Sequence, residues 1–478
     1  MRWQRIASRR VNLRPDRPAL WGSLAASDTG RAAGMAAAVI AANVIALVIT
    51  VVFARLLGAS GYGSLAALIS AFIILMVPGS ALQIAVAREV SADTAAGAGV
   101  RRWLARLGVA TLLVAIVAAA LGDVLAAVIG VEERWAAAAV PVTAMLWMLL
   151  SVMRGALQGF GHYRTVAISI VGESTGRLLL GLALVGLGLD VTGAFLGTPL
   201  SLAVVAALLA FELRPLLPAA LPTGVPPLRE LLAGARAPVA GLTLLFVLQE
   251  VHVIVVKHQA SDDAAGAYAV AAVAGKAIIW VAVGLGLYLL PEVARRAGSG
   301  VDGRPVLTRT LGLIGVLAIP MVLIYAVAGE PLLRVVFGKD LTEASDALPL
   351  LGLAMTLLAG TYLAVQYLLG LHRAAFIWML AAAASVEIGL LALIGADLYE
   401  IALALFAVQA LCAAVVVTVS FRTGPGEPEE LVVAEAGDPR VVASEVVVEQ
   451  AHAGRAPGAV RLDLGRHGVE PADHQLGP

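Results

Sequence analysis

Five ionisable side chains lie inside long apolar stretches of this sequence and fall into two groups. Glu173 and Arg177 form the first, and Glu250, His252 and Lys276 form the second. Glu173 and Arg177 are four residues apart, a spacing that places both on one face of a helix and lets them pair. If these stretches cross a membrane, each charge costs about 2.5 to 3.5 kcal/mol at the bilayer centre and needs a partner or a wet cavity. The Glu173 pair is therefore either a neutralised structural pair or part of a cavity lining.

The second group lies on two consecutive apolar stretches. Glu250 and Lys276 can pair between neighbouring helices, and protonation of Glu250 can then gate a cleft between them. Two further acids, Asp123 and Glu387, stand alone, and we expect each to reach the membrane surface or a local hydrogen bond. The seven His residues lack metal-ligand spacing such as His-Glu-x-x-His, and Gly58, Gly61 and Gly63 lack the Lys-Ser/Thr of a phosphate loop.

The elements that must hold these groups are apolar runs of membrane-spanning length. Hydrophobic residues make up 60% of the chain and charged residues 14%, against about 25% charged in ordinary globular domains. About 20 apolar residues span the hydrocarbon core of a bilayer as a helix. The second run is interrupted at Pro78-Gly79, which predicts a break facing a cavity. We expect about twelve transmembrane helices, near residues 34–54, 62–87, 107–130, 136–153, 165–187, 191–213, 238–256, 266–290, 311–328, 347–369, 374–394 and 398–421.

Composition divides the chain into five parts. Residues 1–32 hold seven Arg and two acids and predict a basic cytoplasmic arm, while the Pro-rich residues 214–236 predict a cytoplasmic linker. Residues 422–478 are rich in Pro, Gly and acids, which predicts a disordered cytoplasmic tail. Between these parts we expect an N-terminal six-helix bundle at 33–213 and a C-terminal six-helix bundle at 237–421.

The distribution of basic residues predicts the orientation. With both termini in the cytoplasm, five of the 33 Lys and Arg residues fall outside, as expected if basic loops stay inside. These five are Arg55, Arg134, Lys257, Arg334 and Lys339.

The two halves also repeat each other. Arg55 is followed 202 residues later by Lys257, and Tyr62 is followed 206 residues later by Tyr268. Because each half has an even number of spans, the two copies have the same orientation and are related by an axis along the membrane normal. We therefore expect an all-α polytopic membrane protein of two parallel-repeat bundles around a central cleft.

Four motifs between residues 33 and 421 resemble those of flippases that move lipid-linked polysaccharide repeat units. These flippases belong to the multidrug/oligosaccharidyl-lipid/polysaccharide exporter superfamily. The motifs are Ala54-Arg55-Leu56-Leu57-Gly58 with Gly61-Tyr62-Gly63 and a following Val86-Ala87-Arg88-Glu89, then Arg154-Gly155-Ala156-Leu157-Gln158-Gly159, Ala265-Gly266-Ala267-Tyr268 and Pro331-Leu332-Leu333-Arg334-Val335-Val336-Phe337-Gly338.

The resemblance implies a flippase that moves a polyprenyl-pyrophosphate-linked oligosaccharide across the cytoplasmic membrane by alternating access. It places Arg55 at the cavity, where a guanidinium can hold a pyrophosphate by forked hydrogen bonds. The alternative is that Arg55 and Lys257 reach the lipid headgroups at helix ends. Arg177 and Lys276 are the other substrate-binding candidates, and the acids and His of the two groups, Glu173, Glu250 and His252, are the coupling candidates. Members of the family that this chain resembles often carry an Asp in this part of the seventh span, within a segment resembling Asn-x-Asp. Glu250-Val251-His252 stands there instead, which weakens the coupling role that the resemblance implies.

The expected partners are the lipid-linked glycan, membrane lipid, a coupling cation such as a proton or sodium, and proteins of polysaccharide assembly. We expect no nucleic acid, cofactor or enzymatic activity. Two alternatives stay open: a drug/cation antiporter of the same superfamily, and a membrane polymerase of polysaccharide assembly. A polymerase would be expected to carry acids in a sizeable outer loop, whereas the outer loops here are short. The expected location is the inner membrane, with multiple spans and both termini in the cytoplasm.

Overall fold

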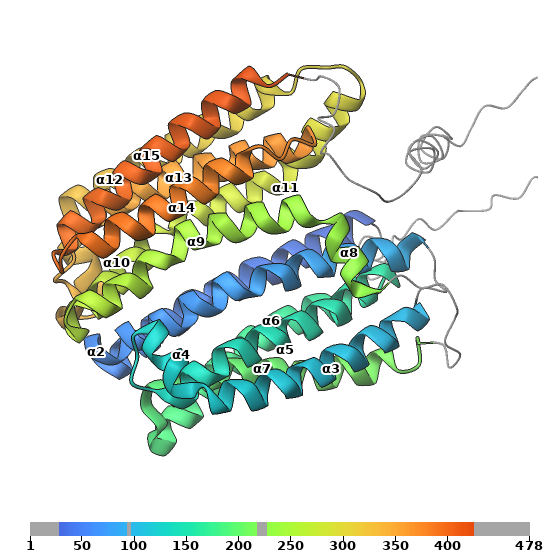
Figure 1. Ribbon diagram of the computed structural model, residues 1–478, viewed down its shortest axis with the longest axis horizontal. Coiled ribbons are helices and arrows are strands. Elements are labelled where there is room, and N and C mark those ends of the chain that lie inside the picture. The colour runs from blue at the N-terminus through green and yellow to red at the C-terminus, as the bar shows by residue number, and fades with distance from the viewer. Residues whose placement is uncertain (1–27, 93–96, 218–226, 425–478) are drawn as a thin grey trace, which may run out of the picture. The chain divides into compact units, whose positions relative to one another are not determined.

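The computed structural model describes residues 28–92, 97–217 and 227–424, and every regular element in these ranges is a helix (Figure 1). The predicted tail beyond residue 424 and residues 1–27 of the basic arm lie outside the described residues. Helix α2 begins at Asp28, so the end of the predicted arm belongs to the first helix.

The helices follow the predicted order of spans. The first half contains α2 (Asp28–Ala92), α3 (Gly97–Ala120), α4 (Gly122–Ile129), α5 (Arg134–Gly159), α6 (Tyr163–Leu184), the π-helical turn η2 (Val185–Leu189) and α7 (Asp190–Leu213). A short helix, α8 (Leu228–Gly234), lies in the predicted linker. The second half contains α9 (Arg236–Gln259), α10 (Asp262–Gly275), α11 (Ala277–Gly298), α12 (Arg304–Val336), the 3-10 turn η3 (Lys339–Leu341), α13 (Leu348–Gly370), α14 (Phe376–Leu393) and α15 (Leu398–Arg422).

Ten continuous helical stretches in the described residues are long and apolar enough to cross a membrane. Two of them, residues 33–92 and 163–213, are long enough for two crossings each, so the predicted twelve spans are all present. The chain is therefore an all-α polytopic membrane protein with six spans in each half. The predicted third span consists of two helices, because the chain breaks between α3 and α4 at Leu121.

Glycine sets the geometry of α2 at two points. Gly58 has φ 67° and ψ −173°, a conformation that other residues rarely adopt, and it separates the first span from the second. The predicted break at Pro78-Gly79 is wrong, because α2 continues through both residues. A Cβ on Gly79 would lie 2.7 Å from Cδ1 of Trp147, so this glycine allows α2 and α5 to pack closely.

Candidate functional site

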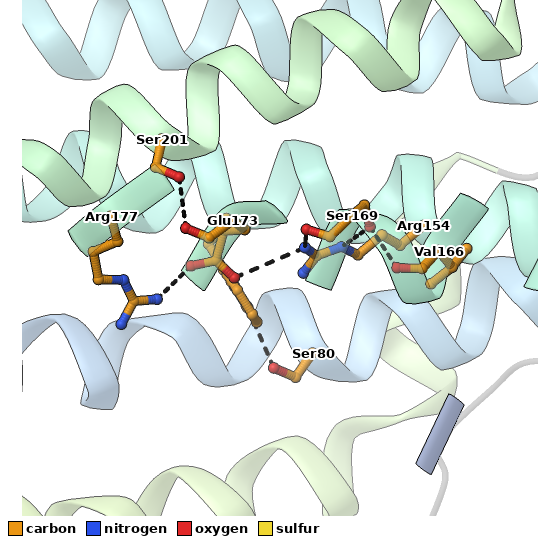
Figure 2. Close-up of polar contacts among 8 residues, drawn as sticks. Ser80, Arg154, Val166, Ser169, Glu173, Arg177 and Ser201 are labelled. Carbon is orange, nitrogen blue, oxygen red and sulfur yellow. Dashed lines mark hydrogen bonds and ion pairs between the residues drawn. The ribbon is translucent and has the colours of Figure 1, made fainter. Parts of the chain in front are cut away.

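Glu173 of α6 lies between two arginines in the first half (Figure 2). Its Oε1 accepts a hydrogen bond from Arg177, one helical turn along α6, so the pair that their spacing predicts is present. Its Oε2 lies 3.8 Å from Nη2 of Arg154, which belongs to α5. The Ser201 hydroxyl, on α7, donates to the Glu173 backbone carbonyl at 2.7 Å. We call Arg154, Ser169, Glu173, Arg177 and Ser201 the Glu173 cluster.

Arg154 is the member of the cluster that sequence reasoning missed. The predicted fourth span, near residues 136–153, ended before Arg154, but α5 continues to Gly159 and only 3% of Arg154 is exposed. Its Nε donates to the Ser169 hydroxyl at 3.0 Å, and its Nη2 donates to the Ser169 carbonyl at 2.9 Å. The guanidinium also lies 5.7 Å from the ring centre of Trp147, within cation–π range. The only sequence signal was the position of Arg154 at the start of a motif.

The Glu173 cluster contains more positive than negative charge. Two guanidinium groups share one carboxylate, and Nε of Arg177 is buried without a hydrogen-bond partner among the described residues. The Arg177 side chain is 25% exposed, whereas that of Glu173 is 5% exposed. Part of the Arg177 guanidinium side chain therefore lies at the accessible edge of the cluster, although Nε itself is buried. A partly accessible guanidinium in a cluster with excess positive charge is suited to an anionic group.

Glu250 of α9 connects the two halves. Its carboxylate accepts hydrogen bonds from Lys276 at 2.8 Å, from Gln249 at 2.8 Å and from the Ser70 hydroxyl at 2.7 Å. The predicted pairing of Glu250 with Lys276 is present, and Lys276 lies where α10 meets α11. Ser70 belongs to α2 of the first half, so one buried carboxylate joins both repeats. Three donors satisfy this carboxylate, as a buried charge requires.

His252 is held separately from Glu250. Its Nδ1 lies 3.0 Å from the Tyr268 hydroxyl, and its Nε2 lies 2.9 Å from the Gln249 carbonyl oxygen. The rings of His252 and Tyr268 meet edge to face with centres 5.6 Å apart. The carbonyl can only accept, so Nε2 is the donor in that contact. Both ring nitrogens of His252 therefore have a partner.

Glu387 of α14 and Gln409 of α15 form a second buried polar pair in the C-terminal half. The Gln409 amide donates to Glu387 Oε2 at 2.8 Å and to the Leu248 carbonyl of α9 at 3.3 Å. The local hydrogen bond expected for Glu387 is therefore present. Glu387 Oε1 and Gln409 Oε1 are buried, and neither has a hydrogen-bond partner among the described residues. The other lone acid, Asp123, is exposed and lies 3.4 Å from Arg134.

Arg55 and Lys257 both contact protein groups at the ends of helices. The Arg55 guanidinium donates to the carbonyl oxygens of Val335 at 2.5 Å and Val336 at 3.1 Å, the last residues of α12. It therefore caps a helix of the opposite half, where exposed carbonyls favour a cation. Lys257 is buried and pairs with Asp262 within its own half.

Several contacts between the halves lie around Arg55, in a region that we call the Arg55 end. Here Gly266 of α10 lies against Ala59, so closely that a Cβ on Gly266 would overlap the Ala59 carbonyl. Nearby, Nε2 of His258, next to Lys257 in α9, lies 3.0 Å from the Ala127 carbonyl oxygen of α4. In the described part of the chain, the hydrogen bonds and ion pairs of the Glu173 cluster all stay within the first half.

The described residues thus form an all-helical, multi-pass membrane protein with buried ionisable groups within and between its two halves. The chain is similar to the inward-facing conformation of a multidrug resistance MATE family transporter of the MOP superfamily. The TM-score is 0.64 at 14% identity, over 78% of this chain and 93% of that chain. It is also similar to the lipid II flippase MurJ in an inward closed conformation, with a TM-score of 0.60 at 12% identity, over 81% of this chain and 87% of that chain.

An outward-facing conformation of a MATE family multidrug transporter matches with a TM-score of 0.53 at 14% identity, over 82% of this chain and 95% of that chain. No family model matches the sequence. No curated protein matches it either. The fold of this chain is therefore similar to the folds of these MATE and MurJ structures.

Proposed function

We propose that this protein is a flippase that translocates a polyprenyl-pyrophosphate-linked oligosaccharide across the cytoplasmic membrane by alternating access. The observation that carries the proposal is the charge of the Glu173 cluster, in which Arg154 and Arg177 share one carboxylate. A pyrophosphate is an anion that a guanidinium binds through paired hydrogen bonds. Arg177, whose side chain is 25% exposed, is the first contact that we assign to it.

The proposed transport cycle starts from the contacts between the halves. The Arg55 end is closed by the Arg55 bonds to α12 and by Gly266 against Ala59. The Lys and Arg distribution predicts that this end faces outward and that both termini are cytoplasmic. The lipid-linked sugar would then enter from the cytoplasm, and opening of the Arg55 end would release it. We propose that residues 33–213 and 237–421 move as the two bodies.

This cycle gives the other candidates separate roles. Glu250 joins α2 to α9 through Ser70, so its protonation would weaken a contact between the halves, and we assign coupling to it. Lys276 is the ion-pair partner of Glu250. Arg55 would become free to meet the pyrophosphate only after the α12 carbonyls have moved away, which places its contact late in the cycle.

A drug/cation antiporter is the second candidate function. The MATE transporters of similar fold favour it, and so does the buried acid Glu387, which has no cation partner among the described residues. An exporter of cations would be expected to present acids to its substrate. The two functions therefore make opposite demands on the sign of charge around Glu173.

The test is reconstitution of the purified full chain into liposomes with two probes. One probe is a fluorescent polyprenyl-pyrophosphate disaccharide, whose movement is followed by chemical quenching at the outer leaflet, and the other is ethidium, a cationic drug. We expect the wild type to move the lipid probe, and Arg177→Gln to slow this movement about tenfold with unchanged folding. Arg334→Gln is the matched control, because Arg334 also pairs with a Glu one helical turn away but is 59% exposed.

Movement of ethidium without movement of the lipid probe would select the antiporter. Equal rates of lipid movement for wild type, Arg177→Gln and Arg334→Gln would remove Arg177 from the substrate path.

A further inference from the structure

A cavity of about 370 Å3 lies between α3 and the segment that begins α8. The described side chains that line it are those of Arg106, Pro227, Leu228 and Arg229. None of them belongs to the Glu173 cluster or to the contacts at the Arg55 end, so the cavity is not explained by the proposed transport path. We call it the Arg106–Arg229 cavity.

Arg106 and Arg229 are both positively charged, and both line the cavity. Both are exposed, and no acidic side chain is among the described residues that line the cavity. Two guanidinium groups that face the same cavity repel each other unless an anion lies between them. The hydrogen-bonding groups also favour an anion. The two guanidinium groups carry ten N–H donors and no acceptor, so they can only donate. The charge and hydrogen bonding of the cavity therefore select an anion.

The position of Arg106 indicates where that anion comes from. Arg106 is the last charged residue before Asp123, and the apolar part of α3 begins immediately after it. Basic side chains at the end of a membrane-spanning stretch lie at the level of the lipid headgroups. The other two lining residues, Pro227 and Leu228, are apolar, which suits the glycerol and acyl part of a lipid better than a fully hydrated ion.

We propose that the Arg106–Arg229 cavity binds the phosphate group of an anionic membrane lipid. The two guanidinium groups hold the phosphate oxygens, while Pro227 and Leu228 contact the carbon chain next to it. The Lys and Arg distribution predicts that this cavity is on the cytoplasmic side, where basic pockets between membrane helices bind anionic headgroups. A lipid in this position attaches α8 to α3 and so fixes the start of the second half against the first.

The experiment measures lipid binding directly on the purified full chain. Native mass spectrometry counts the phosphatidylglycerol molecules retained as this lipid is titrated, with phosphatidylcholine as the uncharged reference. We expect Arg106→Gln/Arg229→Gln to lose one tightly held phosphatidylglycerol, with affinity about 30-fold weaker for two lost charges. The matched control is Arg101→Gln/Arg164→Gln, which removes two exposed arginines on the same predicted side and should keep wild-type binding.

Two further measurements make every outcome decisive. Arg106→Lys/Arg229→Lys keeps both charges and should retain most of the binding, which tests the site even if the Gln variant folds poorly. Inorganic phosphate at equal concentration should not displace phosphatidylglycerol. Displacement by phosphate would show a general anion site instead of a lipid site. Equal phosphatidylglycerol counts for wild type, the Gln variant and the control would overturn the proposal.

Discussion

Removal of the Glu173 carboxylate should destabilise this protein more than removal of either arginine that it contacts. In Glu173→Gln, Arg154 and Arg177 both lose their acidic partner, and Arg154 is 3% exposed. A buried ion pair that loses one member costs about 3 to 5 kcal/mol, because the remaining charge is left uncompensated. We expect a loss of about 3 kcal/mol in the free energy of unfolding, since the Gln amide can still accept one hydrogen bond.

Arg177→Gln should be much milder. Glu173 still lies 3.8 Å from Arg154 in this variant, so its charge keeps a partner, and Arg177 itself is 25% exposed. We expect a loss of about 1 kcal/mol. The double variant should cost about as much as Glu173→Gln alone, because Arg177 has already lost its partner there. The coupling energy between the two residues is then about 1 kcal/mol.

The measurement is reversible unfolding in mixed micelles, with helicity followed by circular dichroism as sodium dodecyl sulfate is added. Glu330 and Arg334 form the matched control, because they have the same spacing but are 52% and 59% exposed. Their coupling should be below about 0.5 kcal/mol. If Arg177→Gln costs more than Glu173→Gln, Arg154 does not share the carboxylate. Equal coupling in the buried and exposed pairs would refute the reasoning from burial.

Three further predictions concern the rest of the fold. Gly266→Ala should force the halves apart at Ala59 and slow transport strongly, whereas Gly284→Ala, which has no neighbouring atom within 4 Å, should transport normally; equal transport rates would contradict the close contact. The free energy of unfolding of Glu387→Gln should lie within about 1 kcal/mol of the wild-type value, because the site has no described cation and an amide can pair with Gln409. A larger loss, measured by the same detergent titration, would mean that the carboxyl has another partner. Reporter fusions should give the cytoplasm at Ser299 and the outside at Val131 and Leu341, and a cytoplasmic signal at Leu341 would invalidate the orientation.

The sequence alone was sufficient to predict the class of fold and most span boundaries. Long apolar runs have few folded solutions, because a chain in lipid must satisfy every backbone hydrogen bond within its own helix. The ion pair between Glu173 and Arg177 could also be predicted from the sequence, because a helix holds side chains four residues apart close together. The gap between the apolar runs 34–54 and 62–87 also predicted where the first span ends, and Gly58 lies in that gap.

Tertiary structure decided everything that depended on which helices meet. Arg154 lies 19 residues before Glu173 and looked like a loop arginine, yet packing of α5 on α6 buries it beside that carboxylate. Arg55 meets α12 across 280 residues, and Ser70 reaches Glu250 across 180. Periodicity gives the face of a helix on which a residue lies but not the neighbour that the face contacts. Small residues such as Gly79 and Gly266 allow two helices to approach closely. Whether they do so depends on the shapes of both helix surfaces, which the sequence of one helix does not give.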